Sequence, residues 1–266
     1  MQLLIGFLAA VGVAFLAYKA HSLSRSGGLA AILVCTLIFG LGGWRWAVIL
    51  LTFFISSSLL TRLFRRQKAA VDEKFSKGGQ RDVGQVLANG GIAAALAVLS
   101  AIFPAAGWSW WLFVASMAAV NADTWATELG ILNPRPPRLI TNGRAVERGT
   151  SGAISPVGTL AALGGSGLVA LLAGLISPLP SSPVNILLIT LAGLVGALLD
   201  SLLGATCQAI YHCPSCNKET ERHPLHLCGT PTSHLRGWKW LDNDMVNLAC
   251  ALSGAGSMLL FACIFL

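Results

Sequence analysis

Long apolar stretches recur along this chain and are separated by short polar segments. A helix that crosses a bilayer needs about 20 consecutive, mostly apolar residues. The 266 residues are 55% hydrophobic and 11% charged, with a mean hydropathy of +0.70, whereas a soluble domain carries about 25% charge. A chain of this composition cannot cover itself with polar surface. The sequence therefore predicts an all-α fold, a polytopic transmembrane helical bundle of about eight spans, over residues 2–18, 29–43, 45–61, 86–103, 108–130, 156–177, 184–206 and 245–265.

Positive charge is distributed unevenly between the predicted loops. Seventeen of the 18 Lys and Arg residues lie in alternate loops, namely 19–28, 62–85, 131–155 and 207–244. The remaining one, Arg45, lies on the opposite side of the predicted membrane. Lys and Arg collect in cytoplasmic loops, so these four loops are expected in the cytoplasm and both termini on the non-cytoplasmic side. The same asymmetry accounts for the net charge of +7. We therefore expect the lipid bilayer, and no nucleic acid, as a partner.

The domain organisation follows from the same pattern. Residues 1–266 are expected to form a single integral membrane domain. Residues 207–244, which we call the Cys/His loop, are expected as a cytoplasmic insertion between the last two spans.

Acidic and amide side chains gather near the cytoplasmic ends of the predicted spans. Acids inside a span are costly and are by default candidates for function, although they could also make only packing hydrogen bonds or lie at the interface. Mg²⁺ takes one or two carboxylates together with substrate phosphates. Asp123 and Asp200 are the first candidates to hold Mg²⁺, with Glu128, Asp242 and Asp244 as further catalytic acids. The other polar candidates are Asp82, Asn89, Asn243 and Asn247.

The cytoplasmic loops supply cationic and glycine-containing segments. Gly, Ser and Thr at a helix start present backbone N–H groups and the positive dipole end to an anion, and Arg binds phosphate oxygens in a forked geometry. An ordinary helix cap beside positive-inside arginines is the alternative. A lipid phosphate held through a divalent metal fits this pattern, because its head lies at this depth and its tail lies among the helices. The candidate phosphate ligands are Arg81, Arg144, Arg148, Thr150, Ser151 and Gly152.

The Cys/His loop contains four of the seven cysteines. Cys213 and Cys216 form a CxxC knuckle, and Cys228 follows twelve residues later, with His223 and His226 between them. A structural Zn²⁺ takes four N or S ligands, which the three cysteines and either His226 or His223 would supply. Free or redox-active thiols remain open, as does a disulfide, although a reducing cytoplasm disfavours one. Further candidate ligands are Cys207, His212 and His234.

Several of these segments together resemble a known family. They are ADTWATELG at 122–130, PRLIT at 137–141, GTSG at 149–152, the 213–228 segment and WLDND at 240–244. The sequence resembles, from about residue 72 onward, the integral membrane family that includes transmembrane protein nineteen and the plant and cyanobacterial phytyl-phosphate kinases of tocopherol synthesis. The resemblance implies phosphoryl transfer from a nucleoside triphosphate, with CTP as the expected donor, to a prenyl monophosphate such as phytyl phosphate. Residues 123–130 and 143–150 are also similar to lipid-alcohol kinases of the dolichol and phytol type.

The sequence thus predicts a membrane-embedded, Mg²⁺-dependent prenyl-phosphate kinase with a nucleotide co-substrate. Two other classes remain open. A transporter or flippase for a polyprenyl or other anionic ligand would use the acids as a proton or cation site, and a non-catalytic scaffold would use only the zinc-organised loop. Transporters commonly show symmetry between their halves, and we find no convincing repeat. The sequence also lacks a P-loop motif.

Overall fold

The computed structural model describes residues 1–68, 79–105 and 107–265. Residues 69–78 of the expected basic loop, with Lys74 and Lys77, lie outside this part of the chain. The described residues form eight long helices and one short one. They are α1 (Gln2–Lys19), α2 (Arg25–Leu37), α3 (Trp44–Leu63), the short α4 (Arg65–Lys68), α5 (Val83–Ile102), α6 (Trp108–Gly130), α7 (Pro156–Ile176), α8 (Pro183–Thr206) and α9 (Asn243–Phe265), and a π-helical turn, η1 (Ile38–Gly42), extends α2.

Seven of the long helices in the described part are long and apolar enough to cross a membrane, with α2 and η1 counted as one. The eighth long helix, α6, is more polar because it carries Asn121, Asp123 and Glu128. It occupies the middle of the bundle, where it contacts α3, α5, α7, α8 and α9. The predicted all-α helical bundle is therefore confirmed, with eight long helices of which seven are candidate spans in the described part of the chain. Its most polar long helix is the one that its neighbours enclose.

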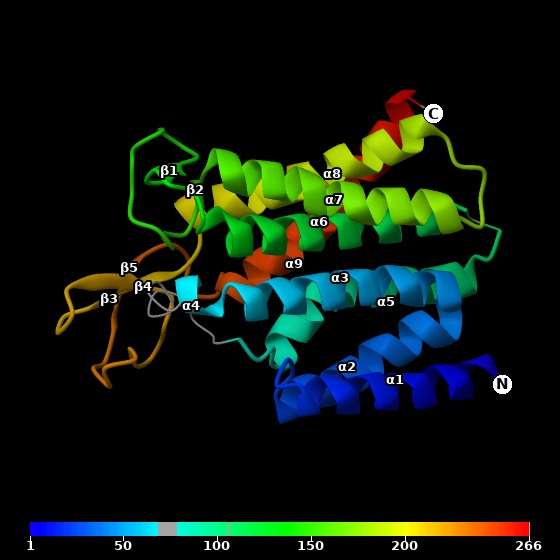
Figure 1. Cartoon of the computed structure of the whole chain (residues 1–266), viewed down its shortest axis with the longest axis horizontal. Coiled ribbons are helices and arrows are strands. Elements are labelled where there is room, and N and C mark those ends of the chain that lie inside the picture. Colours follow the sequence, from blue (N-terminus) through cyan, green and yellow to red (C-terminus); the bar gives the residue numbers. More distant parts are fainter. Residues whose placement is uncertain (69–78, 106, 266) are drawn as a thin grey trace.

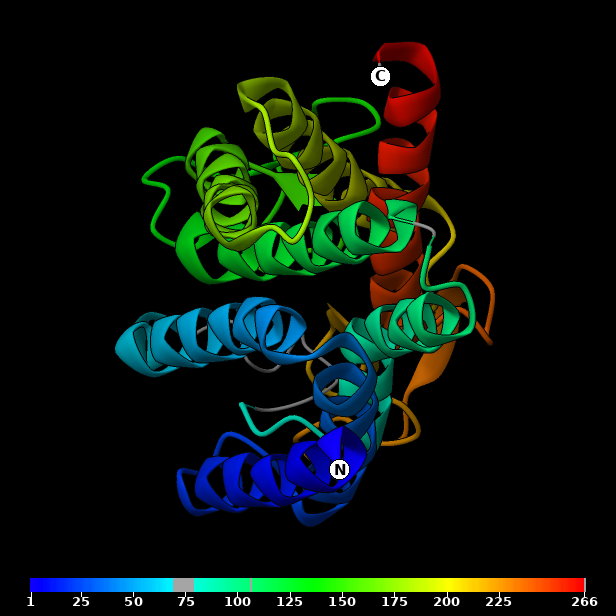
Figure 2. The ribbon, with the colours of Figure 1, turned by 90° about the vertical axis from the view of Figure 1, so that its right-hand side faces the viewer.

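The helices run side by side along the long axis of the molecule. In Figure 1 the strands lie at one end of the bundle, and both the N- and C-terminal ends of the chain lie at the opposite end. We call the first of these the strand end. Figure 2, viewed along the helices, shows α1 and α2 on one side and α6, α7 and α8 on the other, with α3 and α5 between them.

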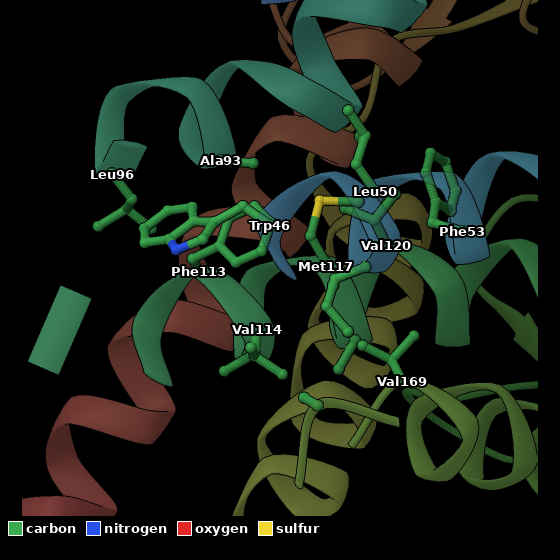
Figure 3. Packing of buried hydrophobic residues seen from close by; sticks show 14 of the residues in the cluster. Trp46, Leu50, Phe53, Ala93, Leu96, Phe113, Val114, Met117, Val120 and Val169 are labelled. Atoms are coloured by element: carbon green, nitrogen blue, oxygen red, sulfur yellow. The ribbon is translucent and has the colours of Figure 1, made fainter. Parts of the chain in front are cut away.

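The apolar core is centred on α6 and its contacts with α3 and α5. The ring centroids of Trp46 and Phe113 lie 4.2 Å apart, and Trp110 meets Trp46 edge-on at 5.8 Å. Figure 3 shows the rings of Trp46 and Phe113 beside Ala93, Leu96 and Met117. All three aromatic residues are almost completely buried. Aromatic pairs of this geometry contribute about 0.5–1.5 kcal/mol each beyond their area burial.

Small residues and polar contacts join α6 to its other neighbours. A Cβ on Gly254 would meet the carbonyl oxygen of Ala115, so α9 packs on α6 at backbone distance. The buried Asn121 donates to the carbonyl of Gly165 on α7 at 2.8 Å and accepts from Ser56 on α3 at 3.0 Å. Close packing at small residues and interhelical hydrogen bonds are how helices associate in lipid, since lipid tails supply no hydrophobic contrast.

Helix starts at the strand end are capped by side chains. Asp82 accepts a hydrogen bond from the backbone N–H of Gln85, and the Gln85 side chain accepts one from the backbone N–H of Asp82, which together form a capping box for α5. Ser155 caps α7 by accepting from the N–H of Gly158, and Pro156 follows at the first helical position. Asp82, a candidate site residue, thus has a structural role, and Ser155 fixes where the preceding loop ends.

Two small antiparallel sheets order the loops at the strand end. Strands β1 (Arg138–Leu139) and β2 (Ala153–Ile154) pair within the 131–155 loop. In the Cys/His loop, β3 (Ile210–Cys213) lies between β4 (Lys218–Thr220) and β5 (Ser233–Arg236). The sequence analysis anticipated no strand here. Strands of two to four residues are too short to show a readable alternation of apolar and polar positions.

Candidate functional site

A cavity of about 150 Å³ lies at the strand end, where α6, α7 and α8 meet the loops. Its wall combines helix residues with the segment from Arg148 to Ser155 and with parts of the Cys/His loop. The candidate residues that line it are Asp123, Arg148, Thr150, Ser151, Gly152, Asp200 and Asn243. Residues separated by more than 100 positions in the chain thus share one cavity.

Two of the predicted acids enter the cavity from different helices. Asp123 on α6 lines it together with Thr127, as their four-residue helical spacing predicts. Asp200 lines it from α8, and its Oδ2 atom is buried with no hydrogen-bond partner among the described residues. Asp200 also lies close enough to Asp123 for their negative charges to repel each other. A buried carboxylate without a partner is costly, so this wall of the cavity favours a cation.

The loop that leads into α7 forms another part of the cavity lining. Arg148 projects its guanidinium at the backbone carbonyls of Asn133 and Pro134, to which Nη2 donates at 2.7 and 3.2 Å. Thr150 and Ser151 add hydroxyl groups beside it. These groups line the same cavity as the carboxylates, so that one cavity holds the acidic, cationic and hydroxyl groups that a metal-bound phosphate needs.

Gly152 holds this loop against the end of α8. Its φ angle is +79°, a left-handed conformation, and a Cβ there would meet the backbone N and Cα of Ala205. On the other side of the contact, a Cβ on Gly204 would lie 2.8 Å from the backbone N of Gly152. Glycine at both positions therefore allows the loop backbone to pack directly on α8.

The Cys/His loop contributes an acid that the sequence analysis did not single out. Glu221, the residue after β4, lines the cavity and accepts hydrogen bonds on Oε1 from the hydroxyl of Ser151 at 2.7 Å and from Nε2 of Gln208 at 2.8 Å. Glu221 lies in the charged run KETER at 218–222. Such a run is typical of a solvated surface, so the sequence carries no signal that one of its members enters a cavity.

The structure does not bring Glu128 and Arg81 to the cavity. Glu128 lies five positions after Asp123, which corresponds to about 140° of rotation around a helix, and its Oε1 accepts from Thr61 on α3 at 2.8 Å. Arg81 donates to Ser58 at 2.8 Å and lies over the rings of two phenylalanines, Phe53 and Phe54. Burial lowers the pKa of Arg81 to about 10, and the charge of Glu128 opposes this shift. These two residues thus make separate polar contacts with α3, Glu128 from α6 and Arg81 from just before α5.

The remaining candidates also lie outside the cavity lining. Arg144 is exposed, and its backbone N–H is bonded to the side chain of Asn142. Asp242 accepts from the N–H of Met245 at 3.0 Å and so caps α9. Asp244 and Asn247 lie in the first two turns of α9, and Asn89 lines a small apolar cavity between α1, α2, α3 and α5.

The four predicted zinc ligands come together in the Cys/His loop. The ligand atoms of Cys213, Cys216, His226 and Cys228 all lie within 4.8 Å of one another. The Sγ atoms of Cys213 and Cys228 are 3.6 Å apart, and Nδ1 of His226 lies 3.6 Å from Cys216 Sγ and 3.2 Å from Cys228 Sγ. Tetrahedral ligands with Zn–S bonds of 2.3 Å are separated by about 3.8 Å. This cluster could therefore bind a metal ion.

The structure distinguishes between the alternatives for this loop. His223 stacks on Tyr211 with ring centroids 4.4 Å apart, so His226 is the histidine that joins the cysteines. All seven cysteines are free of disulfides. Hydrogen bonds with Thr230, and then with His226, lower the pKa of Cys228 to about 5, whereas the hydrogen bond with Cys228 and burial raise the pKa of Cys216 to about 11. Cysteine binds a metal as the thiolate, so the low pKa of Cys228 favours metal binding.

Comparison with known proteins places the chain in a family. Residues 8–255 match the integral membrane protein family DUF92. The chain belongs to this family. It is therefore an integral, multi-pass membrane protein, in agreement with its helices.

Curated relatives of this DUF92 protein occur in plants and archaea. Protein PGR of Arabidopsis thaliana is 38% identical over 264 residues, which cover 90% of this chain and 89% of the relative. An uncharacterized membrane protein of Methanocaldococcus jannaschii is 36% identical over 210 residues, or 77% of this chain and 83% of the relative. Protein VTE6, chloroplastic, of Arabidopsis thaliana is 28% identical over 231 residues, which cover 85% of this chain and 61% of the relative. No solved structure matches the chain.

Proposed function

We propose that this DUF92 protein is a membrane-embedded prenyl-phosphate kinase. The observation that carries the proposal is the cavity at the strand end, which Asp123 and Asp200 line together with Arg148 and the hydroxyl-bearing residues of the following loop. Carboxylates and phosphate-binding groups in one cavity are the parts that phosphoryl transfer needs. The sequence resemblance to the phytyl-phosphate kinases, together with the DUF92 relatives in plants, supports the substrate class.

In this proposal the acidic residues of the cavity bind the metal and the loop residues bind phosphate. Asp123 and Asp200 would hold Mg²⁺, which would neutralise charge on the transferring phosphoryl group. Arg148, Thr150, Ser151 and the backbone at Gly152 bind phosphate oxygens. A phosphate oxygen of the prenyl monophosphate attacks the γ-phosphorus of the donor, a new P–O bond forms, and the bond to the β,γ-bridging oxygen breaks to release the nucleoside diphosphate. The monophosphate is already ionised at neutral pH, so the protein has to position the reactants rather than supply a strong base.

The membrane arrangement is part of the same proposal. The basic loops at the strand end would lie in the cytoplasm and both termini on the other side, so that a soluble nucleotide reaches the cavity from the cytoplasm. The prenyl chain would extend among the helices. CTP is the proposed donor and Zn²⁺ the proposed metal of the Cys/His cluster.

A direct assay tests the activity. Protein purified in detergent is incubated with Mg²⁺, with one of CTP, ATP, GTP or UTP, and with prenyl monophosphates of different chain lengths, and the prenyl diphosphate is measured by mass spectrometry. We expect diphosphate formation with CTP as the preferred donor. If no donor yields diphosphate, the kinase proposal fails and transport of an anionic lipid becomes the leading alternative.

A further inference from the structure

Glu221 connects the Cys/His loop to the cavity. It directly follows β4, whose partner strand β3 ends at the metal-cluster residue Cys213. From this position it lines the cavity, and Ser151 of the 131–155 loop donates to its Oε1. The loop that holds the cysteines therefore also carries a carboxylate into the proposed catalytic site.

Three carboxylates consequently share this cavity. Asp200 lies within electrostatic reach of both Asp123 and Glu221, and its Oδ2 is buried with no hydrogen-bond partner in the described part of the chain. Among the described lining residues, Arg148 alone carries a positive side chain, and its Nη2 is bonded to two backbone carbonyls. Like charges brought together away from water repel strongly. A divalent cation between the carboxylates would remove this repulsion and provide a partner for the orphaned oxygen of Asp200.

We propose that Glu221 is the third carboxylate ligand of the divalent-cation site formed by Asp123 and Asp200. The inference rests on the proposed function for its first two ligands and adds a third, which comes from the Cys/His loop. Three carboxylate oxygens form a hard donor set of the kind that Mg²⁺ and Mn²⁺ prefer. The Cys/His loop then has a role in the site, because its sheet fixes the position of one ligand.

The competing role for Glu221 is purely structural. As a hydrogen-bond acceptor it could simply tie Ser151 and Gln208 together. Substitution Glu221→Gln separates the two roles, because glutamine keeps an accepting Oε1 but removes the negative charge. Glu219→Gln is the matched control. Glu219 lies two residues earlier on β4, is exposed, and does not line the cavity.

The test measures Mn²⁺ binding to full-length protein in detergent by electron paramagnetic resonance, with and without CTP, so that it does not depend on turnover. The wild-type protein and Glu219→Gln are expected to bind Mn²⁺ equally. Glu221→Gln should weaken binding by roughly 10-fold or more, because the number of charged ligands sets cation affinity. Zinc content is measured on the same samples and should be equal in all three proteins, which shows that the Cys/His loop is intact.

Two results would overturn the inference: wild-type affinity for Mn²⁺ in Glu221→Gln, or no Mn²⁺ binding by the wild-type protein in either condition. Failure of the proposed function is distinguishable. Weakened Mn²⁺ binding in Glu221→Gln, in a protein that forms no prenyl diphosphate, would support the cation site and reject the kinase. Diphosphate formation with unchanged Mn²⁺ binding would reject Glu221 as a ligand and leave the kinase proposal standing.

Discussion

Asp123 on α6 and Asp200 on α8 lie within electrostatic reach of each other in one cavity. If the two share Mg²⁺, each negative charge is needed for catalysis but neither is needed for the fold. We predict that Asp123→Asn and Asp200→Asn insert and purify normally, while kinase activity falls by at least about 10²-fold, because metal stabilisation of the transferring charge contributes several kcal/mol. Prenyl diphosphate formation per folded molecule is the measurement.

Glu219→Gln is the control for these two variants, because it removes an acid that does not line the cavity. Its activity should equal that of the wild-type protein. Near-normal specific activity of both Asn variants would show that the two carboxylates serve packing, and poor yield with full activity per folded molecule would point the same way.

The second prediction concerns the metal of the Cys/His loop. Purified protein should contain about one zinc ion per chain, because four N and S ligands form a closed structural site. The double substitution Cys213→Ser/Cys216→Ser should remove it, whereas Cys263→Ser, at an exposed cysteine near the end of α9, should not. Inductively coupled plasma mass spectrometry checks the content. Zinc-free wild-type protein with thiols that alkylate freely would contradict the assignment.

The third prediction concerns the contact between the 148–155 loop and α8. Gly152 has a left-handed backbone conformation, and the Cβ that Gly152→Ala adds would overlap atoms of Ala205. Gly143→Ala is a matched control, because Gly143 also has a positive φ, of +68°, but has nothing within 4 Å of the added Cβ. Gly143→Ala should lower the free energy of unfolding by about 1–2 kcal/mol, because alanine is unfavourable at a positive φ. Gly152→Ala should cost clearly more and lower activity as well.

Thermal unfolding in detergent, with limited proteolysis of the 131–155 loop, measures both glycine variants. Equal stability of the two proteins would show that the contact with α8 is not close enough to constrain residue 152.

The fourth prediction concerns orientation in the membrane. The exposed positions Asn142 and Ser181 lie in loops at opposite ends of the bundle. Because the basic loops are proposed to be cytoplasmic, a membrane-impermeant maleimide added to intact cells should label Ser181→Cys, whereas Asn142→Cys should react only after the membrane is opened. Protein without an added cysteine measures the background from the exposed native Cys228 and Cys263. The reverse pattern would place the cavity on the non-cytoplasmic side.

The sequence alone identifies most of the bundle, because long apolar stretches leave a chain few alternatives in lipid. It also predicts Asp123, Asp200 and residues of the 148–152 segment as candidates, and the structure places them in the lining of one cavity, while their roles stay a prediction. It does not resolve which side of α6 Glu128 faces, since that requires knowing which neighbour covers each face. The sequence does not predict Glu221 as a site residue, for a different reason. The position of this residue depends on how a short sheet docks on the bundle, and no local pattern encodes that contact.

The enclosed position of α6 bears on how the protein is made. An aspartate inside a span costs up to about 2.5–3.5 kcal/mol at the translocon, the value that holds at the helix centre, and α6 carries Asp123 as well as Asn121. Ser56, the partner of Asn121 on α3, is synthesised before α6, whereas Gly165, its partner on α7, emerges only afterwards. Asn121 therefore lacks one of its hydrogen-bond partners when α6 leaves the ribosome. The packing around α6 is therefore complete only after α7, α8 and α9, which cover it in the folded protein, have been synthesised.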